Sequence, residues 1–255
     1  MPGPLRRIGI GIGSDPEKVI RSIRETGLPG VGFFCYCLPG TVLPGAPDDR
    51  VEIVTSPDPG RALVEDLVAG KIGAAVRGTL PSNSTLRALK LATGVDRLER
   101  IALLETAAGT KFLLAPVGVD EGWSVEEKLS LIEKGRTIAE KLGLPRNVAV
   151  LSGGRLGDIG RHPRVDASIE EAKLVAQRGD ATHYQILIED AVKECGLVIA
   201  PDGISGNLIF RTLTLIGGGQ AHGAPVVNID GIFVDTSRAS PNYANALLLA
   251  ASLLE

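Results

Sequence analysis

The chain has 255 residues, 44% of them hydrophobic, and a formal net charge of −3. This length and apolar content provide for a sizeable core, in one large domain or in two smaller units, and they exclude a disordered chain. The slight acidity argues against general nucleic-acid binding, which requires a basic face. The longest apolar run, near residues 246–254, is too short to span a bilayer, so we expect neither a nucleic-acid nor a membrane partner.

The cysteine content favours a reducing compartment. Three cysteines, Cys35, Cys37 and Cys195, make a disulfide framework unexpected. Cys35 and Cys37 are two residues apart in a strand-like run, so both thiols would share one face and could meet a metal ion. Without a nearby histidine or further cysteine we expect core packing instead, and we predict no metal site. Arg6 and Arg7 are followed by a glycine-broken run rather than a signal sequence, so we expect a cytoplasmic protein.

The first part of the chain alternates strand-like and helix-like segments. A β-rich run over 6–12 precedes Asp15 and Pro16, which are typical of a helix start, and this helix is expected to end near residue 25. Strands at 31–37 and 51–55 follow, separated by a proline- and glycine-rich loop over 38–49, and then a helix over 60–69.

The glycines at the start of the chain resemble a dinucleotide-binding loop without matching it. In a frame that begins at Gly9, with Gly11 as the second glycine, the sixth position is Ser14, and no acidic partner for a ribose follows. We therefore interpret these glycines as sites of close packing.

The segment 71–87 is the first candidate for ligand binding. A strand of small apolar residues ends at Arg77, at the carboxyl end where open α/β sheets place their ligands. Thr79 and Ser82 follow, and Ser82 or Ser84 could cap a helix over 85–92. Arg77 with these hydroxyls would suit a phosphate; the alternative is a helix-capping turn with solvated arginines.

The middle of the chain carries a second polar turn. Paired strands are expected at 101–106 and 111–117, then a helix that starts with the capping box at Ser124 and ends at Gly143, and a strand over 147–151. Ser152 and Gly153 open a long glycine-rich loop whose length fits a lid or a binding loop. Helices are expected over 168–177 and 184–193. The histidines are isolated in sequence, and we expect the first of them to be solvent-exposed; they are His162, His183 and His222.

Two turns near the C-terminus could each bind an anion. A strand over 197–200 leads into Asp202, Gly206 and Asn207, which open a helix that stops at 217–219. Small polar residues between a strand and a helix leave backbone N–H groups where an anion can sit. After the next strand, Ser237 and Arg238 provide a hydroxyl and a guanidinium that fit phosphate or carboxylate. The alternative is that both are ordinary turns between a strand and a helix, with a solvent-exposed arginine.

Strands that alternate with helices along the whole chain predict an α/β fold, with a mainly parallel sheet and helices on both faces. Several segments then point to a known family. Residues 73–87 resemble a "GAVHTTADTLR"-type segment, 148–152 a "VAMLS" strand, 202–207 the "DGFVGN" and "DAGN" turns, and 225–238 a "KPVNDLSRG" segment. These are motifs of the phosphate acetyl/butyryltransferase superfamily, which shares the two-lobed isopropylmalate dehydrogenase-like fold. Among its compact members the chain is most similar to an archaeal branch named for methyltransferase subunit X, a methanogenesis marker.

The resemblance implies an organisation and a site. One lobe would be 1–98 plus 237–255 and the other 99–236, with a ligand cleft between them. The family's Ser-Arg pair corresponds to Ser237 and Arg238, but residues 239–245 contain no carboxylate, whereas the transferases place an acidic residue there to assist the thiol of coenzyme A. Asp202 is the remaining candidate for proton transfer. The expected site residues are Asp202, Ser237 and Arg238 as catalytic groups, and Arg77, Thr79, Ser82, Ser152, Gly153, Gly206 and Asn207 as ligand contacts.

Two functions remain open from the sequence. The first is a transferase-like protein that binds a small phosphorylated or acyl-phosphate ligand, with coenzyme A as a candidate cofactor, as a methyltransferase subunit associated with methanogenesis. The second is a non-catalytic or regulatory subunit of a methyltransferase complex. A dehydrogenase ranks last, because the aspartates near the two C-terminal turns are scattered; they are Asp202, Asp230 and Asp235. A homodimer is expected from the resemblance.

Overall fold

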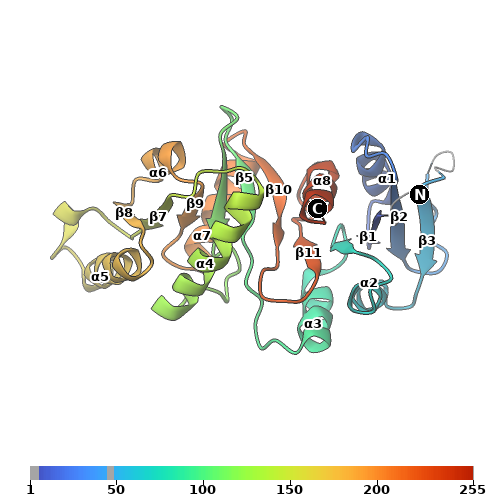
Figure 1. Ribbon diagram of the computed structural model, residues 1–255, viewed down its shortest axis with the longest axis horizontal. Helices are drawn as coiled ribbons and strands as arrows, with labels where there is room; N and C mark the ends of the chain where they lie inside the picture. Colours follow the sequence, from blue (N-terminus) through green and yellow to red (C-terminus); the bar gives the residue numbers. More distant parts are fainter. Residues whose placement is uncertain (1–5, 45–48, 255) are drawn as a thin grey trace. The chain divides into compact units, whose positions relative to one another are not determined.

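The computed structural model describes residues 6–44 and 49–254, and it has the predicted α/β architecture with mainly parallel strands (Figure 1). The chain divides into two compact units, residues 1–98 with 222–255 and residues 99–221. The sequence assigned 222–236 to the second lobe. In the structure this segment belongs to the first unit, because the strand Ile232–Asp235 pairs with Ala74–Val76.

The sheet of the first unit is parallel except at one edge. Its order is β3-β2-β1-β4-β11-β10, where β10 is antiparallel to β11. The strands are β1 (Arg6–Ile12), β2 (Val31–Cys37), β3 (Val51–Thr55), β4 (Ala74–Val76), β10 (Gln220–Pro225) and β11 (Ile232–Asp235). Of the loop expected over 38–49, residues 45–48 lie outside the described residues.

The helices of the first unit lie on both faces of this sheet. α1 (Pro16–Glu25) and α8 (Ala244–Leu253) cover one face, and α2 (Pro59–Val68) and α3 (Ser82–Thr93) cover the other (Figure 1). The chain moves outward from β1 to β2 and β3, then returns through α2 to place β4 on the other side of β1. The loops after β1 and β4 therefore diverge to opposite faces, which creates a topological switch point between them.

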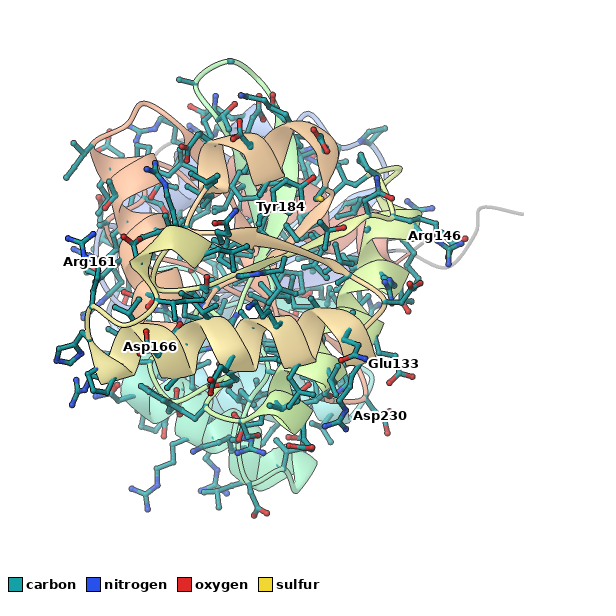
Figure 2. All side chains as sticks on the ribbon, turned by 90° about the vertical axis from the view of Figure 1, so that its left-hand side faces the viewer. Glu133, Arg146, Arg161, Asp166, Tyr184 and Asp230 are labelled. Atoms are coloured by element: carbon teal, nitrogen blue, oxygen red, sulfur yellow. The ribbon has the colours of Figure 1, made fainter. Side chains whose placement is uncertain are left out.

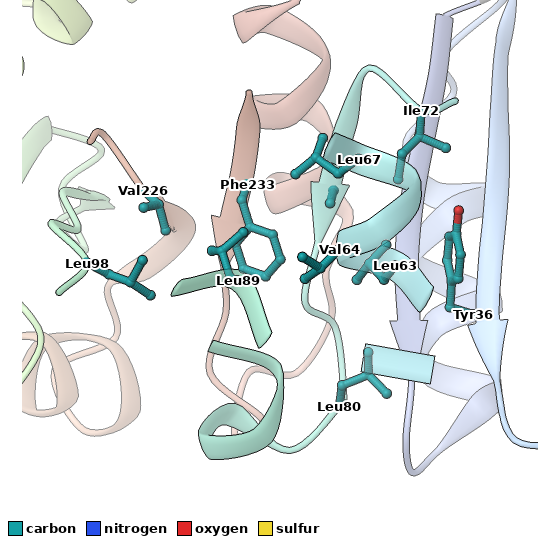
Figure 3. Packing of buried hydrophobic residues seen from close by; sticks show 11 residues of the cluster. Tyr36, Leu63, Val64, Leu67, Ile72, Leu80, Leu89, Leu98, Val226 and Phe233 are labelled. Atoms are coloured by element: carbon teal, nitrogen blue, oxygen red, sulfur yellow. The ribbon is translucent and has the colours of Figure 1, made fainter. Parts of the chain in front are cut away.

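Apolar side chains of α2 and α3 fill the space over this sheet. Figure 3 shows Phe233 of β11 beside Leu89 of α3, with Val64 and Leu63 of α2 nearby, and all four are fully buried. The glycines of β1 permit this packing. A Cβ at Gly9 would lie 2.5 Å from Ile72 Cδ1 and 2.6 Å from Leu63 Cδ1. The interpretation of these glycines as close-packing sites is confirmed.

The second unit has its own sheet, in the order β5-β6-β9-β7-β8, and only β5 is antiparallel to its neighbour. α4 and α5 pack on one face, α6 and α7 on the other. The strands are β5 (Ala102–Glu105), β6 (Lys111–Ala115), β7 (Val148–Leu151), β8 (Thr182–Gln185) and β9 (Leu197–Ile199), and the helices are α4 (Val125–Lys141), α5 (Pro163–Arg178), α6 (Ile188–Glu194) and α7 (Gly203–Leu215).

One helix of this unit differs from the prediction. The sequence predicted a helix over 184–193, but Thr182–Gln185 forms β8, and α6 begins only at Ile188. β8 is four residues long, polar, and paired on one side alone, so it lacks the apolar pattern of an interior strand. Gln185 has a φ of 58°, which ends the strand before the helix can start.

The packing of β1 gives a testable prediction. An added Cβ at Gly11 would lie 2.6 Å from the carbonyl oxygen of Arg77 and would also overlap Leu80. Gly11→Ala is expected to lower the free energy of unfolding by about 1–3 kcal/mol, measured by urea denaturation, because the backbone carbonyl cannot move away easily. Gly157→Ala is the control, since no atom lies within 4 Å of its added Cβ. Equal stability of the two variants would contradict the packing argument.

Candidate functional site

A pocket of about 250 Å³ lies in the first unit, at the carboxyl edge of its sheet. The turn after β1, Ile12–Ser14, and the turn after β4, Thr79–Pro81, both line it, so it occupies the switch point between these strands. The remaining lining comes from Leu38 after β2, from Pro57–Gly60 around the start of α2, from Ser84 and Thr85 in the first turn of α3, and from Arg238. This is the position at which open α/β sheets bind their ligands.

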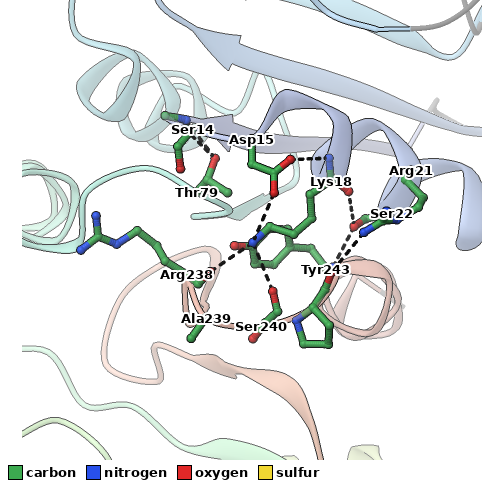
Figure 4. Close-up of polar contacts among 12 residues, drawn as sticks. Ser14, Asp15, Lys18, Arg21, Ser22, Thr79, Arg238, Ala239, Ser240 and Tyr243 are labelled. Carbon is green, nitrogen blue, oxygen red and sulfur yellow. Dashed lines mark hydrogen bonds and ion pairs between the residues drawn. The ribbon is translucent and has the colours of Figure 1, made fainter. Parts of the chain in front are cut away.

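Thr79 joins the two turns that flank the pocket. Its hydroxyl oxygen accepts hydrogen bonds from the backbone N–H groups of Gly13, at 3.0 Å, and Ser14, at 3.2 Å (Figure 4). Its own N–H donates to the carbonyl of Gly11. A hydroxyl that accepts twice still has its own proton to donate. Thr79 therefore holds the wall of the pocket together and retains one donor.

The start of α3 differs from the sequence expectation. The helix begins at Ser82 itself, its N-cap is Pro81, and no side chain caps it, so neither Ser82 nor Ser84 has the predicted capping role. The N–H groups of the first turn therefore keep the partial positive charge of a helix N-terminus beside the pocket. Thr85 is buried, and its hydroxyl has no hydrogen-bond partner within the described part of the chain.

Arg77 is buried behind this edge rather than exposed to it. Its Nε lies 2.5 Å from Oδ1 of Asp235, its Nη1 donates to the carbonyl of Leu80 at 2.7 Å, and its Nη2 donates to the carbonyl of Thr236. Asp235 Oδ1 also accepts from the N–H of Thr236. Arg77 thus connects the turn after β4 to the end of β11, and three of its nitrogens are engaged by protein groups.

The loop after β11 carries the predicted Ser-Arg pair. Arg238 is exposed and lines the pocket, whereas the hydroxyl of Ser237 accepts from the N–H of Ala239 at 3.2 Å. Side chains of helix α1 bind the backbone of this loop. Lys18 Nζ donates to the carbonyls of Arg238, at 3.1 Å, and Ser240, at 3.2 Å, and lies over the ring of Tyr243 (Figure 4).

Two further bonds from α1 complete this anchor. Arg21 donates to the carbonyl of Pro241 at 3.3 Å, and the hydroxyl of Ser22 accepts from the N–H of Tyr243 at 2.8 Å. Nothing in the sequence indicated the contacts that Lys18, Arg21 and Ser22 make with this loop. They belong to the first helix, whereas the loop lies close to the C-terminus. Their partners are 220 to 222 residues away.

The other predicted site residues lie in the second unit. β7 and β9 are parallel neighbours, so Ser152 and Gly153 after β7 and Asp202 after β9 follow strand ends at the same edge of the sheet. The loop from β7 leads to α5 and the loop from β9 leads to α7 on the opposite face, which makes this edge a second switch point.

The turn 202–207 is held by structural contacts. Asp202 caps α7, and its Oδ1 accepts from the N–H of Ser205 at 2.7 Å. The N–H of Gly206 donates to the carbonyl of Asp202, and Asn207 Nδ2 donates to the carbonyl of Val117 at 3.0 Å. A Cβ at Gly206 would overlap the carbonyl of Pro116. The Gly206 N–H expected to meet an anion therefore serves the helix instead.

The structure gives His183, which is isolated in the sequence, a partner from a distant segment. Ser152 Oγ lies 2.8 Å from His183 Nε2 and donates to the carbonyl of Gly154 at 2.9 Å. The pairing depends on β8, the strand that the sequence did not reveal. Burial, and then the charge of Lys173, lowers the pKa of His183. His162 is exposed as predicted; its Nδ1 caps the start of α5 by accepting from Arg164 N–H.

The loop from Ser152 to α5 is braced along its length. Gly153 N–H donates to Ser168 Oγ at 2.9 Å, Leu156 N–H to Gln185 Oε1 at 2.8 Å, and Gly160 N–H to Asp166 Oδ1 at 2.8 Å. Figure 2 shows Asp166 at the start of α5 and Arg161 at the outer edge of the loop.

Cys35 and Cys37 are buried in β2, which confirms core packing, and burial raises the pKa of Cys35 to about 12. Across residues 6–44 and 49–254, no group of three or more His, Cys, Asp or Glu side chains is placed to hold a metal ion. Within the same ranges, no helix has both the length and the apolar character needed to cross a membrane.

Two named relatives are similar in sequence to most of this chain. The chain is 40% identical to "Uncharacterized methyltransferase MK0941" of Methanopyrus kandleri, over 97% of this chain and 98% of the relative. It is 48% identical over 208 residues to "Putative methyltransferase mtx subunit X" of Methanosarcina mazei, which covers 80% of this chain and 74% of the relative. No protein-family model matches the chain.

Solved structures show the same fold. A branched-chain phosphotransacylase from Enterococcus faecalis superposes with a TM-score of 0.75 at 17% identity, covering 98% of this chain and 99% of that one. A phosphotransacetylase from Streptococcus pyogenes gives a TM-score of 0.66 at 16% identity, covering 99% of this chain and 94% of that one.

The Arg77–Asp235 pair gives a second prediction. Asp235→Asn removes the negative charge and leaves a buried guanidinium uncompensated, so it should lower the free energy of unfolding by about 3–5 kcal/mol in urea denaturation. The control is Glu65→Gln, which breaks the exposed Arg61–Glu65 pair and should leave the free energy of unfolding nearly unchanged, because solvent screens that pair. A loss at Asp235 no larger than that at Glu65 would show that the buried pair does not hold the edge together.

Proposed function

Because the chain belongs to the family of the archaeal mtx subunit X proteins, which are named as methyltransferases, we propose that it is a transferase-like protein that binds a small phosphorylated or acyl-phosphate ligand. In this proposal it acts as a methyltransferase subunit associated with methanogenesis. The observation that carries the ligand class is the pocket at the switch point of the first unit.

The chemistry of this pocket favours an anion. Arg238 offers a guanidinium with a fork of donors that matches phosphate oxygens. The N-terminus of α3, which no side chain caps, adds partial positive charge, and Thr79 adds one hydroxyl donor. A volume of about 250 Å³ suits a small ligand or the phosphorylated end of a larger one, such as coenzyme A.

Within this proposal the site residues have different roles. Arg238 binds the phosphate and Ser237 shapes the loop that presents it, whereas Arg77 acts from behind by fixing the end of β11 against the turn after β4. Ser82 remains a proposed contact at the start of α3. In the second unit, Ser152, Gly153 and Asn207 remain proposed ligand contacts, and Asp202 remains a proposed proton-transfer group.

The second candidate is a non-catalytic or regulatory subunit of a methyltransferase complex. Two observations favour it: residues 239–245 contain no carboxylate, and one oxygen of Asp202 already serves as a helix cap. The relatives' name, which contains the word subunit, agrees with assembly into a larger complex. A ligand that binds without turnover, together with co-purification of a methyltransferase, would favour this candidate.

Arg238→Ala tests the ligand site. Titration calorimetry with inorganic phosphate and with acetyl phosphate should show at least about tenfold weaker binding than the unaltered chain, because a charge-assisted hydrogen-bond pair is lost. Arg211→Ala is the matched control, since Arg211 is an exposed arginine on α7 and does not line the pocket. Unchanged binding in the Arg238 variant would remove this pocket as the phosphate site.

We further propose that the chain forms a homodimer through α7. This helix is rich in apolar residues, yet Ile204 is 49% exposed, Leu208 60%, and Ile216, just beyond its end, 84%. An exposed apolar stripe of this kind is typical of an interaction surface.

Leu208→Glu tests this assembly. The substitution places a charge in the apolar stripe, so light scattering should show a shift from dimer to monomer at micromolar concentration. Leu91→Glu is the control, because Leu91 is 75% exposed on α3 and lies outside the stripe. A monomer in the unaltered chain, or a dimer that survives the Leu208 change, would contradict the proposed interface.

A further inference from the structure

The outer face of α5 takes no part in the ligand pocket of the first unit. The inner face of this helix packs into the second unit through Ile169, Ala172, Val175 and Ala176. The opposite face, at the helical spacing of three and four residues, carries Arg164, Ala167, Glu170, Glu171 and Leu174. All of these outer residues are exposed except Glu171, which is partly buried. The helix therefore presents a mixed face of charged and apolar side chains to the solvent.

A groove of about 530 Å³ lies beside this face, and its other wall is residues 123–126 at the start of α4. Trp123 is 54% exposed there, and Leu174 of α5 is 43% exposed. The indole is nevertheless held in place: Nε1 donates to the carbonyl of Val119 at 3.1 Å, and the N–H of Trp123 donates to Glu127 Oε2 at 2.9 Å. A large aromatic side chain that is fixed yet open to solvent is typical of an interaction surface.

Two ion pairs join α4 and α5 around the groove. Lys128 Nζ lies 2.5 Å from Oε1 of Glu171, and Arg178 Nη1 lies 2.9 Å from Oε1 of Glu126. The third glutamate that lines the groove is Glu170. Within residues 6–44 and 49–254 it forms no ion pair, so its carboxylate is available to a cation from outside the chain.

The charges on the outer face are arranged symmetrically about Ala167. Arg164 precedes this alanine by three residues and Glu170 follows it by three. At 1.5 Å per residue, the two charges lie about 4.5 Å from Ala167 along the helix axis, in opposite directions. Like Glu170, Arg164 forms no ion pair with the described part of the chain. When two such helices lie antiparallel with their alanines facing, each arginine is opposite a glutamate, so the face is complementary to itself.

Apolar side chains follow the same symmetry. Leu174 lies seven residues after Ala167, and Ile159, which is 54% exposed, lies eight residues before it in the loop that leads into α5. In the antiparallel arrangement this loop of one copy approaches the Leu174 end of the other, where Trp123 borders the groove. The small side chain of Ala167 at the centre lets the two helices approach closely.

We propose that the outer face of α5 is an interface between two copies of this chain, in which the helices lie antiparallel and Arg164 of each copy pairs with Glu170 of the other. The twofold axis passes at Ala167. Because α5 and α7 pack on opposite faces of the second unit's sheet, this contact adds to the proposed α7 contact and links α7 dimers into a larger assembly. It depends on no ligand.

The first test places a thiol on the twofold axis. Cross-linking suits this interface because a contact formed by exposed charges dissociates readily. With a short bis-maleimide reagent, Ala167→Cys should form covalent dimers at least about tenfold faster than Glu133→Cys, because the axis brings the two thiols together. Glu133 is exposed on α4 and does not line the groove (Figure 2). The native cysteines are buried, so the unaltered chain gives the background. Equal rates in the two variants would overturn the proposal.

The second test exchanges the charges in the Ala167→Cys chain. Glu170→Arg should slow cross-linking at least about fivefold, because each copy then presents arginine to arginine. Arg164→Glu added to it should restore the rate, since the pairs then form with the signs exchanged. Glu133→Arg is the matched control, because it changes the net charge equally outside the interface. The proposal is overturned if Glu170→Arg has no larger effect than Glu133→Arg, or if the double exchange stays slow.

The α5 contact and the proposed α7 contact can fail separately. Leu208→Glu in the Ala167→Cys chain should leave the rate of cross-linking unchanged, because Leu208 lies on α7. Loss of the cross-link in this variant would assign it to the α7 contact and overturn the α5 interface. Raising the salt concentration should slow cross-linking of Ala167→Cys, because the exposed ion pairs are screened. A rate that salt leaves unchanged would also contradict an interface held by Arg164 and Glu170.

Discussion

The buried contact between Arg77 and Asp235 is the constraint on which the first unit's ligand edge depends. It joins the turn after β4 to the end of β11, across 158 residues of sequence, and the same guanidinium also binds two backbone carbonyls. An isolated buried charge is expensive, so the two side chains must stay together. The contact therefore ties the turn after β4 to the start of the loop that carries Arg238, while α1 anchors the rest of that loop.

Both units have a topological switch point, but the polar residues at the two switch points differ. In each, adjacent parallel strands send their chains to opposite faces of the sheet, and polar residues gather at the resulting opening. The first unit places a guanidinium and a helix N-terminus there, which suits an anion. The second places the hydroxyl of Ser152 there, in contact with His183 of the neighbouring strand β8.

Local sequence patterns predicted most of the fold, and they selected Thr79 and Arg238, which line the candidate pocket. Residues that are neighbours in the sequence were enough to predict the alternation of strands and helices and the close packing at Gly9. They also placed Thr79 just after the end of a strand. What the sequence could not show are contacts between distant segments. Arg77 has the appearance of a ligand residue until Asp235 is seen beside it, and Lys18 gives no sign of its bonds to the loop at Arg238. His183 was missed because β8 is short, polar and at a sheet edge, where hydrophobic periodicity is weak.

The reactivity of the buried cysteines can report local unfolding of each unit. Cys35 and Cys37 lie in β2 of the first unit and Cys195 lies in the second, and burial raises the pKa of Cys35 and Cys195. A thiol reagent can modify them only when the surrounding structure opens, because the thiolate is the reactive form and the folded unit excludes the reagent. The labelling rate of each cysteine therefore measures how often its own unit opens, so the two units can be compared within one molecule.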